Sequence, residues 1–181
     1  MSPRPSLPGD QATVSIHVAI DPASAFAVFT QEIDRWWRRG PAYRVAGRAP
    51  GVLCFEAGVN GRLFEQYETP SGTHLHEVGR VLVWEPPARL VFSWRGANFA
   101  DDETTEVEVQ FEPTAAGTRV TVQHRGWASL RRDHPARHGL EGAELSRMIG
   151  LWWGKLMSSL LELIAVERQL LERDPPSRRN P

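Results

Sequence analysis

His124 is the residue of this chain whose type and position best fit proton transfer. It follows Val120 and Val122 at alternate positions of one predicted strand, so its imidazole points to the same side as the two valines. An inward imidazole can bind a ligand or transfer a proton near neutral pH. A core histidine that bonds backbone groups would occupy the same position, and this alternative stays open.

Tyr67 and Glu65 are the other two acid–base candidates. They share one face of a predicted strand, while Phe64 and Gln66 lie on its opposite face. The alternation does not decide which of the two faces is buried. A buried Glu65 would lose its hydration and become a functional candidate, whereas an exposed one would have no such role.

The remaining histidines and the cysteine give no specific signal for a metal ion or a nucleophile. His74 and His76 share a strand face, and His134 and His138 are four residues apart, but no third ligand stands at a recognisable spacing. Cys54 fits a buried, inert thiol. We therefore expect neither a metal ion nor another cofactor.

The charge balance argues against nucleic acid as a partner. The chain holds 21 Lys and Arg against 22 Asp and Glu, a formal net charge of −1. Arg125, Arg131, Arg132 and Arg137 give one segment a local positive charge, but a nucleic-acid site needs a broader basic face. The sequence also lacks a phosphate-binding glycine loop, a nucleophile elbow and the HExxH motif.

Large aromatic side chains are the strongest compositional feature, and seven of them are tryptophans. An aromatic lining suits an apolar or aromatic ligand, although each ring taken singly also fits ordinary core packing. The whole set comprises Trp36, Trp37, Phe55, Phe64, Tyr67, Trp84, Phe92, Trp94, Trp127, Trp152 and Trp153. As ligand-binding residues we single out Trp36, Trp37, Phe55, Phe64, Tyr67, Trp84, Phe92, Trp94, His124, Trp153 and Met157.

The elements that must position these residues begin with a strand and two short helices. Apolar residues alternate from Val14 to Ile20, which predicts a half-buried strand. Asp21 followed by Pro22 is typical of a helix start, and a second short helix is predicted over Glu32–Arg38.

The middle of the chain predicts an antiparallel meander, because short alternating runs are separated by Gly and Pro. A hairpin through Pro113–Gly117 joins the two clearest strands. The predicted strands are Tyr43–Gly47, Val52–Ala57, Arg62–Glu68, Leu75–Trp84, Arg89–Arg95, Thr105–Glu112 and Thr118–Trp127.

A long helix is predicted from about Leu140 to Glu172, since apolar residues recur there at steps of three and four. Trp153 and Met157 share one of its faces. We therefore predict an α+β fold in which a curved antiparallel sheet of six or seven strands wraps around this C-terminal helix.

Length and composition indicate one globular domain. The chain has 181 residues, and apolar residues make up 41% of them. We expect disordered tails at residues 1–12 and 174–181 and one domain over residues 13–173. A single cysteine, no signal-peptide core and no uninterrupted apolar run of about 20 residues predict a cytoplasmic protein without membrane insertion.

Five segments carry a family resemblance: Thr30–Trp37, Asn60–Glu65, Gly79–Arg95, Thr105–Pro113 and Gly117–Trp127. Together with the terminal helix they resemble the START-related (SRPBCC) superfamily, and within it bacterial homologues of the activator of the heat-shock-chaperone ATPase. The resemblance implies a helix-grip fold with a mostly apolar cavity between sheet and helix. Several chemistries share this architecture, so the fold alone does not choose among them.

Three functions follow as expectations. The first is binding of a small hydrophobic or aromatic molecule in the cavity. The alternative is an enzyme that resembles polyketide cyclases or dehydratases, with His124, Tyr67 or Glu65 as acid or base. A chaperone-interacting regulator is suggested by the family name alone. Exposed apolar residues on the long helix would favour a homodimer.

Overall fold

The computed structural model describes residues 10–173. Of the expected tails at 1–12 and 174–181, residues 1–9 and 174–181 lie outside the described residues. The first strand, β1 (Gln11–Val18), starts two residues before the expected domain boundary. Helix α1 (Pro22–Gln31) then begins as predicted, because the Asp21 carboxylate accepts a hydrogen bond from the Ser24 N–H at 3.0 Å. The second short helix, α2, spans Ile33–Trp36.

Seven strands form one antiparallel sheet in the order β1-β7-β6-β5-β4-β3-β2. The six that follow the helices are β2 (Gly51–Phe55), β3 (Arg62–Thr69), β4 (Gly72–Glu85), β5 (Arg89–Trp94), β6 (Thr105–Thr114) and β7 (Gly117–Arg125). The hairpin predicted between β6 and β7 is present, with Thr114 opposite Gly117. Two 3₁₀ turns, Trp127–Ser129 and Pro135–Arg137, lead to the last helix.

The sheet bends at β4, because this strand changes its pairing partner along its length. Its first part pairs with β3 from Gly72 to Arg80, and its last part pairs with β5 from Val81 to Glu85. Both ladders shift register near the junction, which is the mark of a bulge. Gly79 lies at this bend, where an added Cβ would stand 1.8 Å from the Ser93 carbonyl oxygen.

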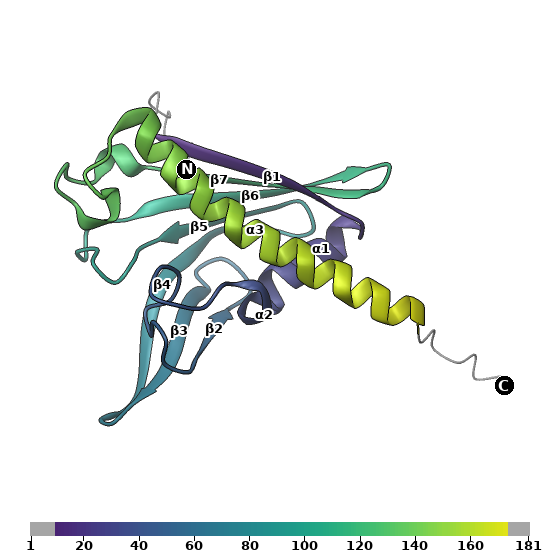
Figure 1. The fold of residues 1–181 in the computed structure, drawn as a ribbon, viewed down its shortest axis with the longest axis horizontal. Coiled ribbons are helices and arrows are strands. Elements are labelled where there is room, and N and C mark those ends of the chain that lie inside the picture. The colour runs from purple at the N-terminus through teal and green to yellow at the C-terminus, as the bar shows by residue number, and fades with distance from the viewer. Residues whose placement is uncertain (1–9, 174–181) are drawn as a thin grey trace.

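Helix α3 (Gly142–Arg173) crosses the concave side of the sheet, as Figure 1 shows. Its inward positions are buried from Leu145 to Ile164. By length and mean hydropathy this one helix among the described residues could span a membrane, but here it is the core helix of the fold. The predicted helix-grip arrangement is confirmed.

One predicted strand is wrong. Residues Tyr43–Gly47 form turns in a loop between α2 and β2. The N–H groups of Tyr43 and Arg44 both bond the Gly40 carbonyl, which closes a turn that an extended strand cannot make. Gly40 and Gly47 have φ values of +105° and +63°, a conformation that favours glycine.

Candidate functional site

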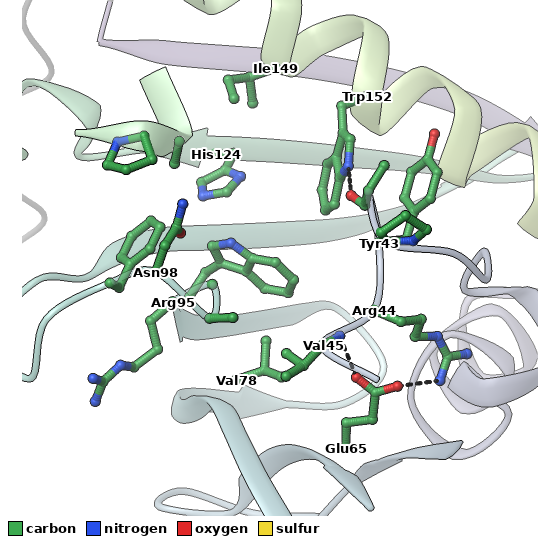
Figure 2. A pocket seen from close by; sticks show the side chains of 18 of the residues that line it. Tyr43, Arg44, Val45, Glu65, Val78, Arg95, Asn98, His124, Ile149 and Trp152 are labelled. Atoms are coloured by element: carbon green, nitrogen blue, oxygen red, sulfur yellow. Dashed lines mark hydrogen bonds and ion pairs between the residues drawn. The ribbon is translucent and has the colours of Figure 1, made fainter. Parts of the chain in front are cut away.

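A cavity of about 470 Å³ lies where the curved sheet, α3 and the loop between α2 and β2 meet. The sheet contributes Val78 and Trp94, α3 contributes Ile149 and Trp152, and the loop contributes residues 41–45. Residues 95–99, between β5 and β6, complete one side. Figure 2 shows these groups around a common space, with the Arg95 side chain pointing away from it.

Aromatic rings form much of the cavity wall and touch one another. Trp37 stacks on Trp94 with ring centroids 5.5 Å apart and an interplanar angle of 28°. Trp152 meets Trp94 at 5.7 Å, nearly edge to face, and Tyr43 stacks on Trp152 at 5.6 Å. Such contacts fix ring positions beyond what burial alone achieves. The wall is therefore a preformed apolar surface.

The loop that closes the cavity is fastened by two of these tryptophans. The Trp152 indole N–H donates to the Ala42 carbonyl at 2.7 Å, and the Trp37 indole N–H donates to the Tyr43 carbonyl at 3.1 Å. The Arg38 guanidinium lies over the Tyr43 ring, 5.7 Å from its centroid. A loop without regular hydrogen bonding thus keeps a defined path beside α3.

Buried charges fasten the same loop to α2 and β3. The Arg44 side chain, 2% exposed, donates to Asp34 Oδ1 at 2.8 Å and to the Trp37 carbonyl at 2.9 Å. Glu65 Oε2 accepts the Val45 N–H at 2.6 Å, and its Oε1 lies 4.0 Å from the Arg44 guanidinium (Figure 2). Every charge in this cluster has an opposite charge or a backbone partner, which is what burial requires.

Asp34 stays ionised in this cluster. Burial alone would raise the pKa of its carboxyl group, but the Leu53 N–H bond at 2.9 Å and the Arg44 guanidinium outweigh burial, so the pKa lies below its usual value. The negative charge that balances Arg44 is therefore present at neutral pH.

His124 is 1% exposed and lies between neighbours that fix its tautomer. The Trp153 indole N–H donates to its Nδ1 at 2.9 Å, so the ring proton sits on Nε2, which lies 2.7 Å from the Thr105 hydroxyl. The Thr105 hydroxyl in turn lies 3.2 Å from the Trp94 carbonyl, to which it donates. Both ring nitrogens are therefore occupied by protein groups.

Burial also keeps His124 neutral. Loss of hydration lowers the pKa of its imidazole from 6.5 to about 3, since no carboxylate lies beside it to stabilise the charged form. A neutral, fully bonded imidazole at the wall is a positioning group for Thr105 and Trp153.

The three acid–base candidates do not converge. His124 and Glu65 both line the cavity, but each is engaged with protein groups. Tyr67 lines a separate, more open depression of about 560 Å³ together with Arg39 and Arg48, and its ring stacks on His74. On β3 the buried face is that of Leu63 and Glu65.

Of the singled-out ligand-binding residues, the structure places Trp37, Trp94 and His124 in the cavity wall. Trp36, Trp153 and Met157 are buried in the core and are not among the lining residues, and Phe55, Trp84 and Phe92 join a neighbouring cluster around Phe26. Phe64 lies on the other face of β3, under the Arg62 guanidinium.

Sequence reasoning did not single out the loop residues that line the cavity. Tyr43, Arg44 and Val45 line it because their segment is a turn, whereas the alternation there predicts a strand. Residues 95–99 and 135–138 give no periodic signal at all. Trp127 and Trp152 belong to the aromatic set, and both reach the cavity.

Neither histidine pair considered for metal binding belongs to a larger ligand group among the described residues. Among residues 10–173 there is no group of three His, Cys, Asp or Glu side chains arranged to hold a metal ion. His134 is buried, accepts the Ala136 N–H on Nδ1 at 3.1 Å and places Nε2 3.0 Å from Glu103. This contact joins the loop before β6 to the segment that precedes α3.

Comparison with known proteins identifies relatives of this fold. The family model described as "Activator of Hsp90 ATPase homolog 1-like protein" matches residues 19–144. No curated protein is significantly similar to the chain.

Solved bacterial structures share the architecture at low sequence identity. Protein MLL2253 from Mesorhizobium loti is 18% identical, with a TM-score of 0.56 and coverage of 91% of this chain and 98% of its own. The AHSA1 protein from Silicibacter pomeroyi is 20% identical, with a TM-score of 0.57 and coverage of 87% and 99%. A protein of unknown function from Staphylococcus aureus is 11% identical, with a TM-score of 0.63 and coverage of 88% and 95%. Identities this low establish the fold alone.

Proposed function

This chain belongs to the family of Activator of Hsp90 ATPase homolog 1-like proteins, and we propose that it binds a small apolar or aromatic molecule in the cavity between its sheet and α3. The observation that carries the proposal is the aromatic wall. Trp37, Trp94, Trp152 and Tyr43 are held against one another around a space of about 470 Å³. Small-molecule sites are cavities of about 300–1,000 Å³ lined mainly by apolar side chains.

The charges around the cavity favour an uncharged ligand. Arg44 and Glu65, which both line it, are bonded to protein groups, and Arg95 pairs with Asp101 at 3.2 Å. A charged ligand would have to break one of these pairs or enter without a counter-charge. Within residues 10–173 the Trp94 indole N–H has no hydrogen-bond partner, so it is available to orient a ligand through an acceptor oxygen.

The two other functions receive less support. A cyclase-like enzyme needs free acid and base groups that reach one substrate, but His124 and Glu65, which line the cavity, are bonded to protein groups, and Tyr67 lines a separate depression. A chaperone-interacting role rests on the family's description and on no surface feature.

We also propose that binding takes place in the cytoplasm. The single, half-buried Cys54 can form no disulfide within the chain, which suits a reducing compartment.

A thermal-shift screen tests the proposal. The purified protein is heated with fatty acids, flavones, sterols and naphthols, and mass spectrometry identifies any molecule that copurifies. A ligand at one hundred times its Kd stabilises by about 2.7 kcal/mol, so Tm should rise by several degrees.

Two tryptophan variants supply the control. Trp94→Leu should weaken binding at least tenfold, because it removes the central ring of the wall. Trp84→Leu changes a tryptophan that is also half-buried, but it packs on Phe26 outside the cavity and should leave affinity unchanged. No stabilising compound, or equal loss of affinity in both variants, would count against the proposal.

A further inference from the structure

The C-terminal end of α3 extends beyond the sheet that covers the rest of the helix. Ile164 is its last buried residue, and Arg173 is its last helical one. The nine residues 165–173, here called the overhang, span about 13 Å at 1.5 Å per residue. Figure 1 shows this end passing α1 and leaving the body of the molecule.

The overhang exposes apolar side chains in an ordered pattern. Val166, Leu170 and Leu171 are 54%, 59% and 66% exposed. Leu163, Val166 and Leu170 stand at steps of three and four, so they form one stripe along the helix. Single exposed apolar residues are ordinary, but an aligned stripe on a projecting helix marks a contact surface.

The sequence that follows the helix is a poor match for this stripe. Residues 174–181 read DPPSRRNP, so proline is their only apolar side chain. The charges beside the stripe instead fit a second copy of the same helix. Glu162 and Arg173 are eleven residues apart, close to three full turns, so both lie on one flank of the stripe. Among residues 10–173 neither has an ion-pair partner.

We propose that the overhang is a self-association surface on which two copies of α3 pair in antiparallel orientation. A two-fold axis at residue 168 places Val166 of one copy against Leu170 of the other. The same axis brings Glu162 to within one residue of the level of Arg173 on the flank. A parallel two-fold pair would instead place the flanks that carry Glu162 and Arg173 on opposite sides of the contact, where these charges cannot meet. Such an interface is isologous, the usual form in a two-fold dimer.

Sedimentation velocity of the full chain between 5 and 200 µM tests the proposal. The wild type should show a concentration-dependent dimer, and Leu170→Glu should raise its Kd at least tenfold. Leu161→Glu is the matched control, because Leu161 is nine residues, or two and a half turns, from Leu170 and faces the opposite side. It is also exposed, at 39%, and its substitution should leave the Kd unchanged.

Charge exchange tests the orientation. Glu162→Arg and Arg173→Glu should each raise the Kd, and the double variant should restore it, since the pair is re-formed with its charges exchanged. Circular dichroism confirms that each variant is folded. A wild type that stays monomeric at 200 µM, or a dimer that Leu170→Glu does not weaken, overturns the proposal. Single charge variants without effect overturn the antiparallel orientation.

Discussion

At the scale of single residues, His124 shows how a buried polar group can belong to a site without performing chemistry. Its position on β7 is the one that strand alternation predicts, and its ring lies in the cavity wall. The Trp153 and Thr105 side chains occupy both ring nitrogens. The alternative of a satisfied core histidine therefore describes its bonds, although the partners are side chains and not the backbone.

The depressed pKa of His124 predicts a pH-dependent stability. The folded imidazole has a pKa of about 3 and the unfolded one about 6.5, so below pH 6.5 the unfolded chain binds the proton and the folded chain does not. The contribution of His124 to the free energy of unfolding should therefore be fully present above pH 6.5. It should fall by about 1.4 kcal/mol per pH unit from pH 6.5 toward pH 3.

The variant His124→Gln isolates this effect, because glutamine can bond the same two partners without titrating. We expect urea unfolding between pH 7.5 and 4.5 to show a smaller loss of stability in the variant than in the wild type. The other histidines and the carboxylates are common to both proteins. Equal slopes in the two would mean that His124 titrates normally.

At the scale of elements, the loop that closes the cavity depends on Arg44. Replacement by methionine keeps most of the side-chain volume but leaves Asp34 and Glu65 without their buried cation. Removing one partner of a buried ion pair costs about 3–5 kcal/mol, and we expect a loss of that size for Arg44→Met in urea unfolding. Hydrogen exchange at residues 42–46 should quicken as well.

The exposed pair of Arg80 and Glu77 supplies the comparison for Arg44. Their side chains are 51% and 38% exposed, and pairs of this kind contribute about 0–1 kcal/mol. Arg80→Met should accordingly change the free energy of unfolding by less than 1 kcal/mol. A comparable loss in the two variants would contradict the buried role of Arg44.

The close approach of the backbone at Gly79 indicates that the bend in the sheet leaves no room for a side chain at this position. An alanine Cβ would stand 1.8 Å from the Ser93 carbonyl oxygen, so β4 and β5 would have to separate. Gly79→Ala should cost at least 1–3 kcal/mol. The same change at Gly150 on α3 meets no atom within 4 Å and should stabilise by about 0.5–1 kcal/mol, since alanine favours a helix. A lower Tm for Gly79→Ala and a higher Tm for Gly150→Ala would confirm both predictions. A small change in Tm for Gly79→Ala would contradict the role of Gly79 in the bend.

Periodic elements were predictable from the sequence, whereas the loops of the site were not. Strands such as β6 and the helix α3 follow from the spacing of buried side chains, because one face of each packs on the core. The Tyr43–Gly47 loop owes its conformation to hydrogen bonds of Arg44, Trp37 and Trp152, whose partners lie outside the alternating segment or, for Trp152, 110 residues away. Alternation could not assign the buried face of β3, since the partners that allow Glu65 to be buried, the Val45 N–H and Arg44, belong to that loop.

At the scale of the whole molecule, the proposed function depends on a cavity in an otherwise packed interior. Val78 and Val107 are both nearly inaccessible strand residues, 4% and 0% exposed, but only Val78 lines the cavity. Enlarging a side chain in a packed core typically costs about 1–3 kcal/mol, whereas an added ring can occupy open space without displacing neighbours.

Phenylalanine substitutions at these two valines test that difference. Val78→Phe should change the free energy of unfolding by less than 1 kcal/mol and should reduce the thermal shift caused by any cavity ligand, because the new ring takes up ligand space. Val107→Phe should lower stability by about 1–3 kcal/mol and leave the affinity of the folded protein intact. If both variants lost stability equally, the interior beside Val78 would be packed in solution and the cavity would have no room for a ligand.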